Sequence, residues 1–132
     1  MVRRIHSFWL FALLALFSTL PTWAIELDTD GDGDIKFVEV TAQETVQVDI
    51  TTYAGTGYEW SLSEILVPDT LLMREGPVFI PDNEDLPGSK GITRFLFQVS
   101  SMPLEEFSIH FQLKRSWETE IEKSFSITFV TH

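Results

Sequence analysis

The chain has 132 residues, which is enough for one domain and too few for two of ordinary size. It contains no cysteine, so it can form neither disulfide bonds nor thiolate metal sites. Twenty acidic residues against nine basic ones give a net charge of −11. Nucleic acids and anionic membrane surfaces would repel so acidic a chain, and both are excluded as partners.

The first residues have the layout of a secretory leader. Two arginines open it, an apolar run follows at residues 8–17, and a polar, helix-breaking stretch precedes Ala24. A membrane anchor is the alternative, but a spanning helix needs about 20 apolar residues. We therefore expect a signal peptide at residues 1–24, cleaved before Ile25. The mature domain, residues 25–132, would carry a net charge of −13. It would be secreted or periplasmic, with no membrane contact.

An acidic segment with two glycines follows at residues 28–35. Together with Glu39 it matches the EF-hand calcium loop, which has acids at positions 1, 3 and 5, glycine at 6 and glutamate at 12. Its surroundings differ from an EF-hand, because no incoming helix fits before the loop and the residues after it are typical of a strand. A tight hairpin turn joining residues 25–27 to 35–40 is the favoured interpretation. If Ca²⁺ also binds, its ligands would be Asp28, Asp30, Asp32, Asp34 and Glu39.

Four later segments alternate apolar and polar residues, as strands do when they pack on one side. They cover residues 45–50, 94–99, 108–113 and 124–129, and no window after residue 24 has a convincing helical repeat. Turn-forming residues separate these segments at spacings typical of a β-sandwich. The pattern therefore predicts an all-β fold in a single domain.

Three connections between these segments are candidate binding loops, because a rigid sandwich presents its loops to partners. The first loop is residues 53–58, and the second is the stretch 79–91, which contains prolines, acids and glycines. The third loop is residues 114–118. The alternative is that all three are ordinary connections.

The sequence offers little for catalysis. Of its three histidines, His6 belongs to the leader, His132 is the last residue, and His110 alternates outward on a predicted strand. There is no cysteine nucleophile, no Gly-x-Ser-x-Gly elbow and no histidine pair at metal-binding spacing. We therefore predict that the protein is not an enzyme.

The three loops resemble those of the chagasin family, which are inhibitors of papain-like cysteine proteases with an immunoglobulin-like sandwich. The family's first loop reads Asn-Pro-Thr-Thr-Gly-Tyr; residues 56–58 match its end, Trp60 follows, and Tyr-Ala-Gly replaces its first three residues. The second family loop, Gly-x-Gly-Gly, is similar to Gly-Ser-Lys-Gly at residues 88–91. The third, Arg-Pro-Trp, is similar to Arg-Ser-Trp at residues 115–117. Order and spacing agree over essentially the whole mature chain.

The resemblance implies an immunoglobulin-like β-sandwich that reversibly inhibits papain-like cysteine proteases by wedging three loops into the cleft. The backbone around Thr56 would cover the catalytic cysteine, Trp117 would lie against an aromatic wall of the cleft, and the second loop would clamp the far side. We expect a monomer that requires no cofactor, apart from the calcium ion considered above. The residues expected to contact the protease are Thr56, Gly57, Tyr58, Gly88, Gly91, Arg115 and Trp117.

A second hypothesis gives the same scaffold another role. The protein would be a non-inhibitory, calcium-binding β-sandwich interaction module at the cell surface or in the periplasm. In that case Tyr58 and Trp60, which alternate along a strand, would be core residues. Gly88 and Gly91 would be ordinary turn residues, and Trp117 would fold from its turn onto the sheet.

Overall fold

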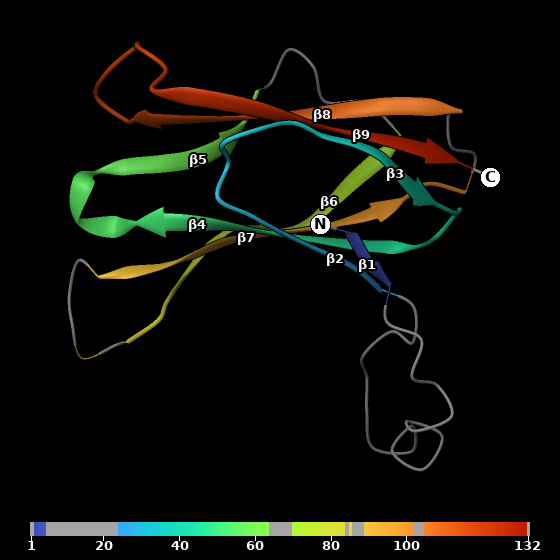
Figure 1. The fold of residues 1–132 in the computed structure, drawn as a ribbon, viewed down its shortest axis with the longest axis horizontal. Coiled ribbons are helices and arrows are strands. Elements are labelled where there is room, and N and C mark those ends of the chain that lie inside the picture. Colours follow the sequence, from blue (N-terminus) through green and yellow to red (C-terminus); the bar gives the residue numbers. More distant parts are fainter. Residues whose placement is uncertain are drawn as a thin grey trace.

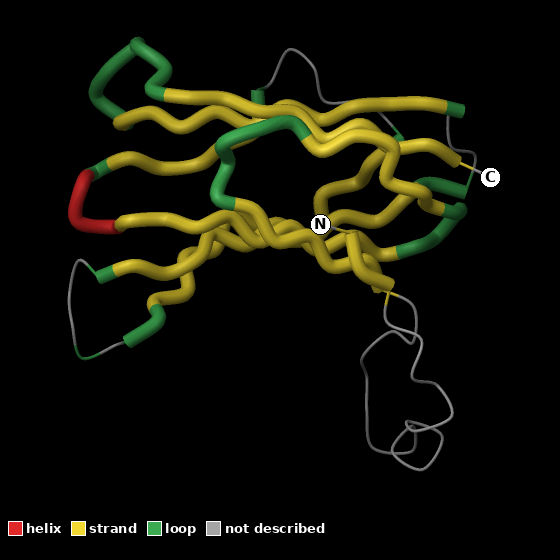
Figure 2. The backbone as a smooth tube through the Cα atoms, viewed as in Figure 1, coloured by secondary structure: helices red, strands yellow, loops and turns green. Residues whose placement is uncertain are grey.

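The computed structural model describes residues 2–4, 24–63, 70–83, 85, 89–101 and 105–131. These residues form two β-sheets that face each other (Figure 1). Most of the described backbone is strand, and its single helical turn lies at one end of the sandwich (Figure 2). The predicted all-β sandwich is confirmed. Its elements are β1 (Val2–Arg4), β2 (Ala24–Thr29), β3 (Ile35–Val40), β4 (Thr45–Tyr53), the 3₁₀ turn η1 (Ala54–Thr56), β5 (Tyr58–Leu62), β6 (Leu71–Pro81), β7 (Lys90–Val99), β8 (Glu106–Arg115) and β9 (Lys123–Thr131).

The order of the strands corrects one prediction. One sheet runs β1-β2-β4-β7-β6 and the other β3-β9-β8-β5. Strand β2 pairs in parallel with β4, and β3 pairs in parallel with β9, so the predicted hairpin between residues 25–27 and 35–40 is wrong. Residues 30–34 instead cross from one sheet to the other. The physical reason is burial: Leu27 and Val38 are both fully buried, and they fill the common core from opposite sheets.

A column of aromatic rings fills the space between the sheets. Phe111 on β8 lies 5.1 Å, between ring centroids, from Phe95 on β7 in the facing sheet. It also stacks on Phe125 of β9 at 5.0 Å, and Phe125 meets Trp60 of β5 edge-on at 5.3 Å. These buried rings occupy alternate positions of their strands, as the period of two predicts. The column ends with Trp60, just beneath the first loop.

Strand β1 comes from the predicted leader. It pairs antiparallel with β2, with Arg3 opposite Glu26. Residues 5–23, which hold the rest of that leader, lie outside the described residues. Cleavage before Ile25 would remove β1 and leave β2 as the edge of its sheet. Within the described residues, no helix has the length and apolarity needed to cross a membrane.

An ion pair on the outer face of the β2-containing sheet links β4 to β7. Arg94 donates through Nε at 2.9 Å and Nη2 at 3.1 Å to the two carboxylate oxygens of Asp49. The Asp49 side chain is only 10% exposed, and its partner raises the pKa of Arg94 further through these hydrogen bonds. The nearly buried carboxylate of Asp49 is therefore paired with a cation through two hydrogen bonds.

Replacing Arg94 with methionine is expected to lower the free energy of unfolding by about 2 kcal/mol, because the Asp49 carboxylate would lose its cationic partner. This loss of unfolding free energy is small for a buried ion pair, because the Arg94 side chain itself is 36% exposed. Urea denaturation at neutral pH measures it. The double variant Asp49→Asn/Arg94→Met should be more stable than Arg94→Met alone. Equal stabilities would show that the uncompensated charge is not the cause.

Candidate functional site

The first loop is a short turn closed by its own hydrogen bonds. Strand β4 ends at Tyr53, η1 follows, and the Gly57 N–H donates to the Ala54 carbonyl at 3.3 Å. The Thr56 hydroxyl donates to the Tyr53 carbonyl at 2.7 Å and accepts from the Tyr58 N–H at 3.3 Å. Gly57 ends the turn with φ +80°, a left-handed conformation that favours glycine. Threonine and glycine at these two positions therefore shape the tip of the loop.

The third loop packs directly against the first. Strand β8 ends at Arg115, and the Glu118 N–H donates to the Arg115 carbonyl at 3.1 Å to form a turn. The Trp117 side chain leaves this turn toward Gly57, where a built Cβ would lie 2.7 Å from its Cη2 atom. Trp117 nevertheless stays 71% exposed. The Cη2 edge of its indole thus contacts the first loop while most of the side chain faces solvent.

Arg115 joins the two loops. It lies opposite Tyr58 in the last residue pair between β5 and β8. Its Nε donates to the Thr56 carbonyl at 3.1 Å, and its guanidinium carbon lies 4.3 Å above the centroid of the Tyr58 ring. The same carbon is 5.9 Å from the ring of Trp117, and Nη1 is 3.5 Å from the Glu118 carboxylate. A single side chain therefore contacts both loops.

Tyr58 and Trp60 are two residues apart on β5 and therefore share one face of the strand, but they differ in burial. Trp60 is buried in the core and donates through Nε1 to the Thr51 carbonyl at 3.3 Å, so its interpretation as a core residue is confirmed. Tyr58 is half-buried beneath Arg115 and donates its hydroxyl to the Glu122 carboxylate at 3.4 Å. Partial burial raises the pKa of Tyr58, although the charge of Arg115 opposes the shift. The phenol therefore stays protonated and acts as a donor at neutral pH.

The second loop is the connection between β6 and β7. Gly88, one of its predicted contact residues, lies outside the described residues. Gly91 is buried within β7, where a built Cβ would overlap the Ile80 carbonyl oxygen and lie 2.8 Å from Cα of Pro81. Its missing side chain thus lets β6 approach β7 at the base of the loop. This position supports the loop and offers no contact surface of its own.

The three connections lie at the same end of the sandwich. In Figure 1 the η1 turn, the β8–β9 turn and the ends of β6 and β7 all project toward the left side of the view. The structure thus brings Thr56, Gly57, Tyr58, Arg115 and Trp117 into one contiguous group. Between the first loop and the acidic crossover lies a recess of about 380 Å³, lined among others by Asp30, Tyr53 and Glu122.

Sequence reasoning missed two residues of this group. Tyr53 is 57% exposed at the start of the first loop, and its position in place of the family's asparagine was the signal that could have found it. Glu122 receives the Tyr58 hydroxyl although 64 residues separate them. No local pattern marks Glu122, because the fold of the β8–β9 turn alone brings it there.

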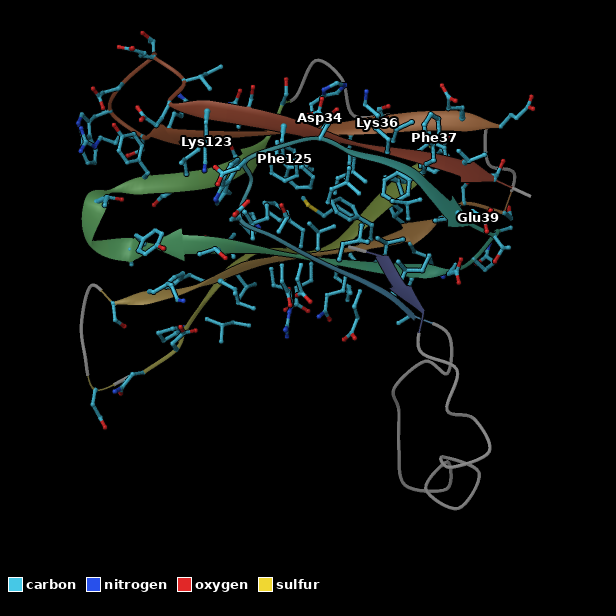
Figure 3. The ribbon with its side chains drawn as sticks, in the orientation of Figure 1. Asp34, Lys36, Phe37, Glu39, Lys123 and Phe125 are labelled. Carbon is cyan, nitrogen blue, oxygen red and sulfur yellow. The ribbon has the colours of Figure 1, made fainter. Side chains whose placement is uncertain are left out.

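The carboxylates of the acidic crossover have separate partners. Asp30 accepts from the Asp32 N–H at 3.0 Å, and Asp32 forms an ion pair with Lys123, which lowers the pKa of Asp32. Asp34 accepts from the Ser126 N–H at 2.8 Å. Figure 3 shows Asp34 and Glu39 toward opposite ends of β3, and Asp28 belongs to β2 in the other sheet.

This arrangement does not assemble the predicted calcium ligands. Among the residues that the structure describes, no three His, Cys, Asp or Glu side chains are grouped so that they could hold a metal ion. All five predicted ligands are within that described part. Calcium binding by this segment stays a prediction, and titration calorimetry of the purified domain with Ca²⁺ tests it.

Comparisons with known proteins agree with this geometry. Residues 39–129, which include all three loops, match the model of the chagasin family peptidase inhibitor I42. A search of curated proteins gives no match. The crystal structure of the cysteine protease inhibitor EhICP2 from Entamoeba histolytica is similar with a TM-score of 0.61 and 16% identity, covering 83% of this chain and 96% of that one.

Two further solved structures are similar. The solution structure of Amebosin has a TM-score of 0.55 and 14% identity, covering 80% of this chain and 98% of that one. The structure of PbICP-C in complex with falcipain-2 has a TM-score of 0.48 and 15% identity, covering 83% and 98% of the two chains. At such identities, EhICP2 and Amebosin show that this chain shares their fold.

Proposed function

This chain belongs to the chagasin family of peptidase inhibitors, and we propose that it reversibly inhibits papain-like cysteine proteases by filling their active-site cleft. One structural neighbour, EhICP2, is a cysteine protease inhibitor, which supports this choice of target. No catalytic activity is proposed. His110, the one histidine among the described residues, lies half-buried on the outer face of β8.

The contact between the first and third loops carries the proposal. Trp117 is a large aromatic side chain held against Gly57 and yet 71% exposed. Tryptophan is enriched among the residues that dominate binding energy in protein interfaces. An indole that is already ordered before binding also loses less entropy when a partner covers it. Tyr53, at 57% exposure, is a second exposed aromatic side chain and belongs to the first loop.

Each loop would have its own role in the cleft. The backbone at Thr56 and Gly57 would cover the catalytic cysteine, because a glycine tip lets the chain approach closely. Trp117 would bind an aromatic wall of the cleft, and the β6–β7 connection would clamp the opposite side. Because the loops would fill the cleft without forming a covalent bond to the protease, the inhibition would be reversible. The inhibitor would act as a monomer.

The export of the protein forms part of the proposal. We expect residues 1–24 to be removed, so that the inhibitor meets its protease outside the cytoplasm. Mass spectrometry of the protein recovered from the periplasm or medium should find a chain that begins at Ile25. A chain that still contains the leader would contradict the predicted cleavage without affecting the inhibitor fold, because β2 keeps its pairing with β4.

Inhibition of papain by the purified mature domain is the decisive experiment. A titration with a fluorogenic peptide substrate is expected to give a submicromolar inhibition constant, and activity should return on dilution. Trypsin serves as the control, because its cleft carries a serine nucleophile and a different wall. Full papain activity at high micromolar concentrations of the domain, with or without Ca²⁺, would reject the proposed function.

A further inference from the structure

The binding loops of this chain lack residues that would make them rigid by themselves. Where the family pattern has Asn-Pro-Thr, the first loop has Tyr53, Ala54 and Gly55, and Ser116 stands where the third loop would have proline. Proline restricts φ to one narrow range, whereas glycine widens the conformations open to the unbound chain. The exposed loops therefore need order from another source.

Arg115 is placed to supply that order. Its Nε donates to the Thr56 carbonyl at 3.1 Å, which holds the tip of the first loop. Its guanidinium carbon lies over the Tyr58 ring, 4.3 Å from the ring centroid, and makes a cation–π contact at the end of the same loop. The Trp117 ring, 5.9 Å away, is the third group that it faces. These contacts span both loops.

Two further contacts hold the Arg115 side chain itself in place. Glu118 lies beside the guanidinium at 3.5 Å, so the third loop contacts Arg115 as well as the first. Glu122 accepts the Tyr58 hydroxyl at 3.4 Å and thereby fixes the ring on which the guanidinium rests. Lysine could not replace this arrangement, because an ammonium group has neither the Nε–H donor nor the planar fork of arginine.

We propose that Arg115 is a positioning residue that locks the first and third loops into one rigid unit, in place of the missing prolines. The proposal rests on the proposed inhibitory function for its effect on affinity. The locking of the loops can be observed without any protease. Arg115 would therefore strengthen inhibition mainly through the order it imposes on Thr56, Gly57 and Trp117.

The order of the loops is measured first, by ¹⁵N relaxation and amide exchange of the mature domain. Arg115→Ala is expected to raise the backbone mobility of residues 54–57 and 116–118 together, and Arg115→Lys should restore little of the lost order. Arg74→Ala removes the same charge from an exposed position on β6 and should leave both loops unchanged. Loops as ordered in Arg115→Ala as in the wild type would overturn the proposal, whether or not the domain inhibits papain.

Affinity is measured second, with a double-mutant cycle. Arg115→Ala should weaken papain inhibition about tenfold, because the loops must then be ordered on binding. Ala54→Pro restores the family's proline at the first position of η1, where proline fits a helical turn. If Arg115 acts by locking the loops, this proline should improve inhibition by the Arg115→Ala variant more than inhibition by the wild type. Equal gains in both backgrounds would show that Arg115 acts by touching the protease. Absence of inhibition by the wild type would reject the proposed function. The relaxation experiment would still test whether Arg115 orders the two loops.

Discussion

Replacing Trp117 with alanine is expected to raise the inhibition constant for papain about 100-fold, as truncation of a central aromatic anchor does in other interfaces. The side chain is 71% exposed in the free protein, so its loss should hardly change the thermal stability of the domain. Inhibition titrations together with thermal denaturation separate these two effects. Inhibition by the alanine variant equal to that of the wild type would show that the third loop does not anchor the complex.

Trp117→Phe is the matched variant for this experiment. Phenylalanine keeps an aromatic ring beside Gly57 but loses the larger indole surface, and about tenfold of the affinity should be lost. Because the indole also covers Gly57, amide exchange of the first loop should be followed in both variants. Affinity that falls while the loop stays ordered assigns the effect to lost contact with the protease.

Replacing Gly31 with alanine is expected to lower the free energy of unfolding by about 3 kcal/mol, through a left-handed backbone and an overpacked contact. Gly31 has φ +82°, and a built Cβ would lie 2.5 Å from Cζ2 of the buried Trp60. Its N–H donates to the Thr29 hydroxyl at 3.0 Å. The acidic crossover thus packs its backbone onto the end of the aromatic column. Urea denaturation of the mature domain measures the loss.

Gly33 is the matched control, and it also separates two interpretations of the segment. An EF-hand loop would need its glycine at Gly33, the sixth position. In this structure no heavy atom lies within 4 Å of a Cβ built on Gly33, and its φ is not in the left-handed region. Gly33→Ala should therefore change the unfolding free energy by less than about 0.5 kcal/mol. A larger loss at Gly33 than at Gly31 would contradict this packing and favour an EF-hand conformation.

Much of the candidate site was open to prediction because it depends on short motifs. Thr56, Gly57 and Tyr58 form a turn through hydrogen bonds within residues 53–58, and local geometry of this kind follows from residue type. The place of Trp117 in a loop also followed from its position between two patterned strands, whereas its exposure came from the structure, because the sequence left open a tryptophan folded onto the sheet. Gly91 was different, because its role depends on how closely β6 approaches β7, and that distance is a property of the sheet.

The sequence by itself determined that this protein is an all-β sandwich with candidate binding loops at strand ends. Alternation of apolar residues specifies which face of each strand is buried, whatever its neighbours are. Only the tertiary structure decided which strands pair, because pairing depends on residues far apart in the chain. It moved β2 and β3 into different sheets, separated Asp28 from Glu39, and set Gly31 against Trp60. It also brought Arg115 to the Thr56 carbonyl. The sequence could not predict this contact, because it spans 59 residues and has no local signature.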